Sequence, residues 1–355
     1  MFFKDSAAYG PDKAGRKRHK VRPYRPRGRR VKPPDPVRFL EQRGLCPGHR
    51  ARVSSLTGGV SSDVVLVRCG HEAIVVKHAL RRFRVRRDWR VDPGRLAVEF
   101  AFAHLIRDRI GPGVVAEPLA YDPAEALLAI RYVSPPFGSW KHRLLAGRLE
   151  PKIAQEAAGL LARIHRLGLE EPALRRAFHQ PRLFKQQRID PYLVAASRRH
   201  PSLAKILQAL ARHLSKDSTT LIHGDFSPKN ILTDGRRIVL IDHEVATFGD
   251  PRFDVAFLVN HLLLKAVRRP TRRIELIGLG RVFLDAYRRA QGPAMLDGLT
   301  ARLVGGLLLA RVDGKSPVEY LSERQRERTR RCANTLLLYP PEDLNALLAA
   351  WPPSS

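Results

Sequence analysis

Three polar residues follow two apolar runs near the middle of the 355-residue chain. Asp225 ends the run LIHGD, Asn230 follows on the same predicted loop, and Asp242 ends the run IVLID. Short apolar runs of this kind predict buried strands, so each run delivers a carboxylate where its strand ends. One carboxylate can accept the proton of an attacking hydroxyl, while a second carboxylate and a carboxamide hold Mg²⁺ on phosphates. The spacing therefore predicts a site for phosphoryl transfer from a nucleotide.

The wider pattern around these residues is HGDxxxxN, then an apolar strand, then IDxExxxxGDPxxDxA. It resembles the aminoglycoside phosphotransferase and choline kinase superfamily, and a compound motif of this length is specific. Within that superfamily, HGDFSPKN and IDHE are most similar to the small-molecule phosphotransferases related to methylthioribose kinase. The resemblance covers roughly residues 50–345. It implies an α+β, bilobal protein-kinase-like fold: a small N-lobe of five antiparallel strands and one helix, and a larger, mainly helical C-lobe.

The resemblance also implies roles for the motif residues. Asp225 is expected to be the catalytic base, and Asn230 and Asp242 are expected to hold Mg²⁺. His223 is expected to be structural and to hydrogen-bond the catalytic loop. Lys229 could meet a phosphate or face water.

Two acidic residues further along leave more than one interpretation open. Glu244 could hold a second metal ion, contact the acceptor, or be an ordinary polar residue at a strand end. Asp254 precedes an apolar segment, and its simplest role is the N-cap of a helix. The resemblance implies a second role, in which this aspartate braces the catalytic loop.

A glycine turn upstream is the candidate cover for the nucleotide phosphates. Gly58 and Gly59 precede two strand-like runs at residues 64–67 and 73–77. Paired glycines let the backbone approach phosphates closely, and Lys77, at the end of the second run, can reach the α- and β-phosphates.

The GGxSS sequence alone is more typical of an ordinary hairpin turn. A phosphate-binding loop is indicated because Lys77 follows at the end of the second strand-like run. The turn is similar to the GGxSN-type loop of the aminoglycoside phosphotransferases, with Ser62 where asparagine is usual. We therefore expect Gly58, Gly59 and Ser61 to bind ATP together with Lys77.

A predicted helix at residues 94–106 carries Glu99 among apolar neighbours. An unpaired carboxylate is costly to bury, and an ion pair with Lys77 would remove that cost. The alternative is that Glu99 lies on the polar face of the helix. The run at residues 127–133 then predicts a strand, and the resemblance implies that this strand is the hinge whose backbone binds adenine.

The rest of the chain is predicted to be mostly helical. Residues 170–202 are less periodic and rich in arginine, and the resemblance implies that this insertion helps to form the acceptor pocket. These patterns predict an N-lobe over residues 39–133 and a C-lobe over residues 134–355. Helical periodicity predicts helices at residues 153–169, 203–214, 255–267, 273–290, 296–311 and 323–338.

Charge separates the first 38 residues from the rest. The chain has 64 Lys and Arg against 34 Asp and Glu, a net charge of +30, and residues 1–38 contain 13 of the basic residues and three aspartates. A segment so basic and so rich in proline is expected to be disordered. It could be an arm that binds polyanions such as nucleic acid, or simply a solvated tail, and the lack of a regular aromatic pattern favours the tail.

The cysteine pattern and the hydropathy of the chain indicate its expected cellular compartment. Cys46, Cys69 and Cys332 form no CxxC motif, which is typical of reduced thiols in a cytoplasmic protein. No stretch approaches the 18 uninterrupted apolar residues that indicate a transmembrane helix. The start of the chain also lacks the apolar core of a signal peptide.

The sequence thus predicts an ATP- and Mg²⁺-dependent kinase that phosphorylates a hydroxyl of a small molecule. A sugar, an aminoglycoside-like compound or an amino alcohol could be the acceptor. Without its tail the chain still carries +20, which favours a sugar or another neutral or anionic compound over a polycation. Two alternatives are a catalytically silent nucleotide-binding protein and a nucleic-acid-associated protein that acts through its basic tail.

Overall fold

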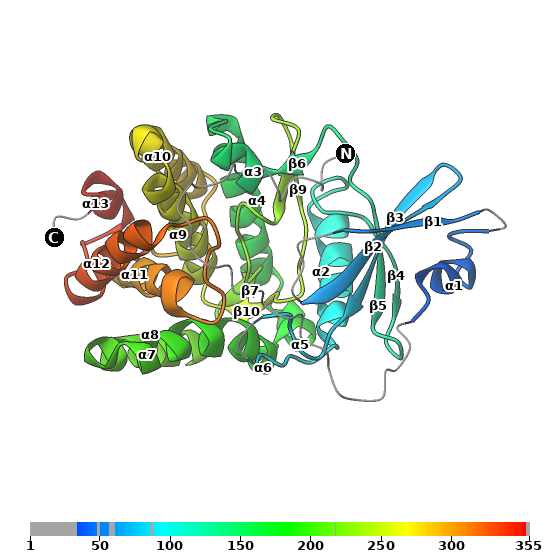
Figure 1. Cartoon of the computed structure of the whole chain (residues 1–355), viewed down its shortest axis with the longest axis horizontal. Coiled ribbons are helices and arrows are strands. Elements are labelled where there is room, and N and C mark those ends of the chain that lie inside the picture. Colours follow the sequence, from blue (N-terminus) through cyan, green and yellow to red (C-terminus); the bar gives the residue numbers. More distant parts are fainter. Residues whose placement is uncertain (1–33, 48–49, 57–60, 86–87, 217, 353–355) are drawn as a thin grey trace, which may run out of the picture.

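The computed structural model describes residues 34–47, 50–56, 61–85, 88–216 and 218–352, and these form two lobes (Figure 1). The smaller N-lobe, on the right of Figure 1, contains a five-stranded antiparallel sheet of order β1-β2-β3-β5-β4. Its elements are α1 (Pro36–Glu41), β1 (Arg52–Ser55), β2 (Ser62–Cys69), β3 (Glu72–Ala79), α2 (Arg95–Arg109), β4 (Pro118–Asp122) and β5 (Leu127–Arg131).

The period of two along β3 divides the N-lobe core between the two faces of the sheet. Ile74 and Val76 pack on one face in a cluster with Phe39 of α1. Val75 points to the other face and packs in a cluster with Leu96 of α2. Since successive strand residues face opposite sides, this apolar strand is buried by a helix on each side. Lys77 follows in the same strand, on the α2 side.

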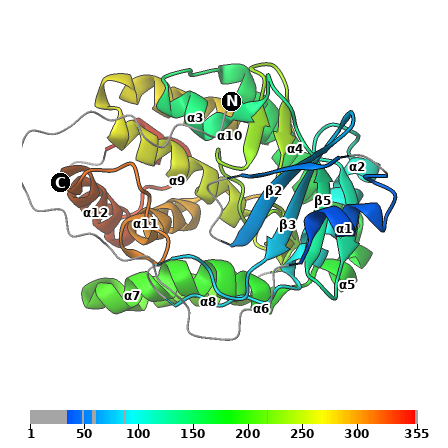
Figure 2. The same ribbon diagram turned by 45° about the vertical axis from the view of Figure 1, so that its right-hand side comes forward.

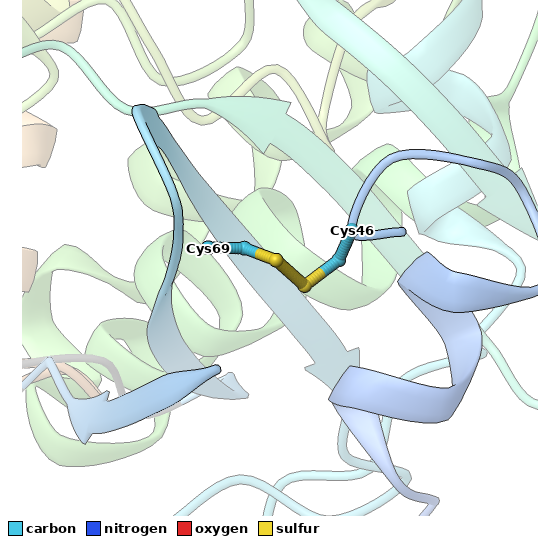
Figure 3. Close-up of a disulfide and its surroundings, with 2 residues drawn as sticks. All are labelled: Cys46 and Cys69. Carbon is cyan, nitrogen blue, oxygen red and sulfur yellow. A yellow bond between two sulfur atoms is a disulfide. The ribbon is translucent and has the colours of Figure 1, made fainter. Parts of the chain in front are cut away.

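A disulfide joins the segment after α1 to the sheet (Figure 3). Cys46 bonds to Cys69, at the end of β2, and Cys332 is the free cysteine among the described residues. The prediction of reduced thiols is therefore wrong for Cys46 and Cys69. Their separation of 23 residues gave no signal, because the packing of α1 on the sheet creates the contact. Disulfides persist mainly in oxidising compartments, so a cytoplasmic location stays a prediction only.

The structure also places the start of the folded part. Helix α1 begins at Pro36, with Asp35 as its N-cap. Residues 36–38, which we predicted to belong to the tail, are therefore part of this helix. Residues 1–33 of the predicted tail lie outside the described residues.

The C-lobe is mainly helical, with short strands next to the N-lobe (Figure 1). Its first elements are β6 (Gly138–Ser139), α3 (Trp140–Leu145), α4 (Pro151–Glu170), η1 (Pro172–Leu174), α5 (Arg175–Phe178), α6 (Pro181–Phe184), the π-helix η2 (Lys185–Val194), α7 (Ala195–Arg199), η3 (Pro201–Leu203) and α8 (Ala204–Lys216). The following elements are β7 (Thr220–Ile222), β8 (Ile231–Thr233), β9 (Ile238–Leu240), β10 (Thr247–Gly249), α9 (Arg252–Arg268), η4 (Pro270–Arg272), α10 (Arg273–Arg289), α11 (Gly298–Asp313), α12 (Glu323–Leu338) and α13 (Leu344–Ala349).

Helix α9 forms the centre of the C-lobe. Every residue from Phe253 to Val267 is buried, as the continuous apolar pattern of this segment predicts. The helix lies between α10 and α11 (Figure 2). No helix of the described residues has the length and hydropathy to span a membrane.

The predicted helices are confirmed to within a few residues at each end. The predicted strands in both lobes are confirmed as β2, β3, β5, β7 and β9. The strands β4, β6, β8 and β10 escaped prediction. The weakly periodic segment at residues 170–202 consists of short helical pieces around η2.

Candidate active site

The chain turns sharply where β7 ends, and this turn presents Asp225 to the cleft between the lobes. Gly224 has a φ of +73°, and a Cβ atom at this position would lie 2.6 Å from the carbonyl oxygen of Val245. Glycine satisfies both the left-handed backbone and the close approach. Asp225, the next residue, lines the cleft.

Asp254 holds the backbone of this turn. Its carboxylate accepts hydrogen bonds from the backbone N–H groups of His223, at 2.7 Å, and Gly224, at 2.9 Å. Pro251 occupies the N-cap position of α9 and Asp254 lies in the first turn, so the prediction that Asp254 is the N-cap is wrong. The bracing role that the resemblance implied is confirmed. Buried donors need acceptors, so this carboxylate fixes the path of the loop.

His223 is structural, as predicted. The backbone N–H of Asp225 donates to His223 Nδ1 at 3.1 Å, and His223 Nε2 lies 3.1 Å from Nδ1 of His243. Because Nδ1 of His223 accepts a hydrogen bond, the neutral ring carries its hydrogen on Nε2, which donates to Nδ1 of His243. Burial lowers the pKa of both histidines, which keeps them neutral. Both ring nitrogens of His223 are thus occupied by hydrogen bonds within the protein.

Asp225 is held from two sides. The side-chain amide of Asn230 donates to Asp225 Oδ2 at 2.8 Å, and Arg188 Nη2 lies 2.9 Å from the same oxygen. Arg188 also donates through Nε to the carbonyl oxygen of Gly224 at 2.6 Å. No hydrogen bond from a described residue reaches Asp225 Oδ1, so this oxygen can accept a proton from a ligand.

Asp242 follows the end of strand β9, next to Asn230. Ile231, after Asn230, pairs with Leu240 across β8 and β9, and the N–H of Ile241 donates to the carbonyl oxygen of Asn230 at 2.9 Å. Asp242 then adopts a φ of +67°, unusual for a residue other than glycine. The loop after β7 and the end of β9 therefore meet at one edge of the cleft.

The predicted ion pair of the N-lobe is confirmed. Lys77 Nζ lies 2.6 Å from Glu99 Oε1, and it also lies 2.8 Å from Asp242 Oδ1. Burial alone would lower the pKa of Lys77, but the carboxylates of Asp242 and Glu99 outweigh it and raise the pKa above its ordinary value. Burial alone would raise the pKa of Asp242, and Lys77 and then Lys229 hold it well below its usual range. The lysine is thus protonated and Asp242 is ionised.

Glu244 has a structural partner. Its carboxylate lies 3.0 Å from Nε of Arg95, which is completely buried at the start of α2. Among the described residues, Glu99, Asp242 and Glu244 offer ligand atoms within 4.8 Å of one another, close enough for a cation. The ammonium group of Lys77 already supplies the positive charge there, since all three carboxylates act to raise its pKa. The group is therefore a lysine-binding cluster.

The remaining residues predicted from the motifs are Ser61, Gly58, Gly59 and Lys229. Ser61 lines the cleft, and Gly58 and Gly59 lie outside the described residues. Lys229 is half exposed, and its Nζ lies 3.8 Å from Asp242 Oδ2. The full cleft is lined by Ser61, Phe83, Trp89, Lys141, Gln187, Arg188, Tyr192, Asp225, Ser227, Lys229, Asp242, Glu244, Phe257, His261, Lys265, Arg311, Ser316, Glu319 and Tyr320.

Sequence reasoning missed two arginines of the site. Arg188 comes from η2, in the arginine-rich segment that the resemblance linked to the acceptor pocket without singling out a residue. Arg95 is the first residue of α2, and its guanidinium donates to the carbonyl oxygens of Ser61 and Leu80 as well as to Glu244. Neither position has a motif of its own, so no local signal separated these arginines from the many others.

One family matches the chain by sequence: the pattern of the phosphotransferase enzyme family matches residues 52–299. No curated protein matches the chain. Solved structures with the same fold include a candidate aminoglycoside phosphotransferase from Ralstonia eutropha JMP134, at 16% identity and a TM-score of 0.52. The alignment covers 85% of this chain and 96% of that one.

Two further structures have this fold. Choline kinase LicA from Streptococcus pneumoniae is 16% identical, with a TM-score of 0.50 and 85% and 96% of the two chains covered. A spectinomycin phosphotransferase, APH(9)-Ia, solved with ADP and spectinomycin, is 13% identical, with a TM-score of 0.51 and coverage of 89% and 97%. These matches confirm the α+β fold and the resemblance to the superfamily. The finer similarity to methylthioribose kinase has no support among them.

Proposed function

The chain belongs to the phosphotransferase enzyme family, and from this premise we propose that it transfers the γ-phosphoryl group of ATP to a hydroxyl of a small molecule. One observation carries the proposal. Asp225 is fixed through Oδ2 by Asn230 and Arg188, while its Oδ1 has no hydrogen bond from a described residue. A base for a hydroxyl needs this combination of a fixed position and one oxygen open to the ligand.

In the proposed reaction, Asp225 takes up the proton of the acceptor hydroxyl. As the acceptor oxygen forms its bond to the γ-phosphorus, Asp225 accepts the proton of the acceptor hydroxyl. The bond from that phosphorus to the β–γ bridging oxygen breaks, and ADP leaves with the electron pair. The buried cation of Arg188 holds the ionised carboxylate in place before the proton arrives.

Lys77 and Glu99 are the proposed nucleotide-binding pair of the N-lobe. The lysine is protonated and held by two carboxylates, so it can donate to phosphate oxygens without leaving Glu99. Gly58, Gly59 and Ser61 are proposed to bind ATP next to it. The solved structure of APH(9)-Ia with ADP supports a nucleotide of this type.

The residues of the cleft fit a magnesium ion. The side-chain oxygen of Asn230 is buried and has no hydrogen-bond partner among the described groups, although its amide nitrogen is bonded to Asp225. A buried carbonyl oxygen without a donor can be satisfied by a cation, and carboxylate and amide oxygens are typical ligands of Mg²⁺. Asn230 and Asp242 would hold the ion. A bound Mg²⁺ neutralises charge on the phosphates.

Release of ADP tests the proposal. Purified protein is incubated with Mg·ATP and a set of alcohols, and ADP is measured with a coupled enzyme assay. At least one alcohol should accelerate ADP release, and Asp225→Asn should abolish that acceleration. Phosphorylated product is then identified by mass spectrometry. Binding of Mg·ATP without transfer to any alcohol would support the silent, nucleotide-binding alternative.

A further inference from the structure

Cations gather on the C-lobe side of the cleft, away from Lys77. Lys265 comes from α9, Arg311 from α11 and Lys141 from α3, and all three line the cleft. Glu319 is the carboxylate paired with Lys141, and its side chain is two-thirds exposed. This part of the cleft therefore has more positive than negative groups.

Lys265 is the most unusual of these cations. It is 1% exposed, and its Nζ donates to the carbonyl oxygen of His261 at 3.1 Å. No carboxylate of the described residues lies within ion-pair distance of it. Burial, with Lys141 and Arg311 nearby, lowers the pKa of Lys265 to about 7. A buried ammonium without a counter-charge is costly, and such groups cluster at functional sites.

Arg311 and Tyr320 also have buried polar atoms without a hydrogen-bond partner among the described residues. Nη1 of Arg311 donates to Ser316 and lies 3.4 Å from the hydroxyl of Tyr192, all neutral partners. Its Nε is buried without a hydrogen-bond partner, and the buried hydroxyl of Tyr320 also has none. The ring of Tyr320 lies 5.8 Å from Nζ of Lys265. Lys265, Arg311 and Tyr320 all line the same cleft, and together they have hydrogen-bonding capacity for an anion.

Resting on the function proposed above, we propose that the acceptor is an anionic alcohol whose phosphate or carboxylate group binds to Lys265, Arg311 and Tyr320. An anion would supply the counter-charge that Lys265 lacks and the acceptors that Arg311 and Tyr320 lack. Cationic alcohols would meet Lys141, Lys265 and Arg311 instead, so the same residues select against them. The hydroxyl of the acceptor would face Asp225, on the same cleft.

Binding is measured first, in the absence of turnover. Inorganic phosphate, glucose 6-phosphate, gluconate, glucose and choline are titrated by calorimetry into the protein, with and without a non-hydrolysable ATP analogue. Phosphate and at least one of the two anionic alcohols should bind, and glucose and choline should not. The two anionic alcohols distinguish a phosphate from a carboxylate. Competition between inorganic phosphate and the ATP analogue would overturn the proposal, because the cations would then hold the nucleotide.

Variants assign the binding to these residues. Lys265→Met removes an unpaired charge and keeps the length of the side chain, and Tyr320→Phe removes only a hydroxyl. Each should weaken anion binding, Lys265→Met by tenfold or more, and leave the affinity for Mg·ATP unchanged. Lys152→Met, on the exposed surface of α4, is the matched control and should leave both affinities unchanged. Thermal unfolding confirms that the variants are folded. Unchanged anion affinity in both cleft variants would overturn the proposal.

Measurements of turnover distinguish the proposed anionic acceptor from the proposed phosphotransferase activity. If neutral or cationic alcohols are phosphorylated as well as anionic ones, and Lys265→Met has no effect, the enzyme is a phosphotransferase and the anionic acceptor is wrong. If anions bind through Lys265 but no alcohol is phosphorylated, the anion site stands and the proposed activity fails.

Discussion

Lys77 of the N-lobe donates a hydrogen bond to Asp242 of the C-lobe at 2.8 Å, so one lysine joins the two lobes across the cleft. Glu99 binds the same ammonium group at 2.6 Å. If Asp242 binds Mg²⁺ as proposed, Lys77 keeps Glu99 as its carboxylate partner.

Asp225 and Asp242 should fail in different ways when substituted. Asp225→Asn removes the base, so turnover should fall about a hundredfold or more while the affinity for Mg·ATP changes little. Asp242→Asn should weaken Mg²⁺-dependent nucleotide binding as well as turnover. Calorimetry of ATP with and without Mg²⁺ separates the two effects. The opposite pattern, with Mg·ATP binding lost only in Asp225→Asn, would reverse the assignment of base and metal ligand.

Lys77 and Glu99 should be energetically coupled. Lys77→Met leaves the buried carboxylate of Glu99 without its cation, at a cost of about 3–5 kcal/mol, whereas Glu99→Gln leaves Lys77 paired with Asp242 alone. Lys77→Met, Glu99→Gln and the double variant form a cycle, measured by urea unfolding and by kcat/KM for ATP. The double variant should lose much less than the sum of the single variants. Additive losses, to within about 0.5 kcal/mol, would contradict the coupling.

Asp254 should stabilise the catalytic loop. Asp254→Ala leaves the buried N–H groups of His223 and Gly224 without acceptors, at a cost of about 1–3 kcal/mol for each group. Urea unfolding should show the loss, and hydrogen exchange at these two amides should accelerate. Asp285→Ala, on an exposed face of α10, is the control and should change neither measurement. Unchanged amide protection in Asp254→Ala would contradict the bracing role.

The disulfide should be detectable in the unfolded protein. Without reductant, thiol titration should find one free cysteine, Cys332, and after reduction it should find three. Replacing Cys46 and Cys69 by serine should destabilise the N-lobe by about 2–4 kcal/mol, because the loop between them is no longer closed in the unfolded chain. Three reactive thiols before reduction would show that the bond is absent.

Binding of an anionic alcohol should weaken as the pH rises through about 7. Lys265 has a pKa of about 7 in the free protein, so it is protonated below that pH and neutral above it. A bound anion favours the ammonium form, so binding takes up a proton. The charged and titratable groups around Lys265 include Lys141, Arg311, Glu319 and His261, and burial lowers the pKa of His261 well below its ordinary value.

Titration of gluconate between pH 6 and 9 checks this dependence, because its carboxylate keeps one charge throughout. Lys265→Met should bind weakly at every pH and show no such slope. A slope of the same size in Lys265→Met would assign the titration to another group.

The pH dependence of folding has the opposite sign for the same lysine. The pKa of Lys265 is about 7 in the folded state and near its ordinary value of 10.5 in the unfolded state, so folding releases a proton between these values. The unfavourable contribution of Lys265 is therefore fully present below pH 7 and decreases up to about pH 10. Relative to Lys265→Met, the protein should gain free energy of unfolding over this window in urea titrations.

The sequence by itself determined the parts of the site that lie on continuous motifs. Asp225 and Asn230 are separated by one short loop, and Asp242 follows the next apolar strand, so local geometry alone brings them to one edge. The pairing of Lys77 with Glu99 was also predictable, because a carboxylate on an apolar helix needs a partner. The long helices followed from periodicity over many residues, and the two lobes from the resemblance to the superfamily.

The tertiary structure alone decided which isolated residues join that site. Arg188 and Arg95 carry no local signal, since their carboxylate partners, Asp225 and Glu244, lie tens of residues away and every arginine of a basic chain looks alike in sequence. The burial of Lys265 followed from its apolar helix, but only the tertiary structure placed it beside the cleft. Asp254 had two plausible roles, and only the position of the loop after β7 beside α9 chose between them. The disulfide depended likewise on the packing of α1 against the sheet. Long-range contacts follow from how the elements pack, and packing is a property of the whole chain.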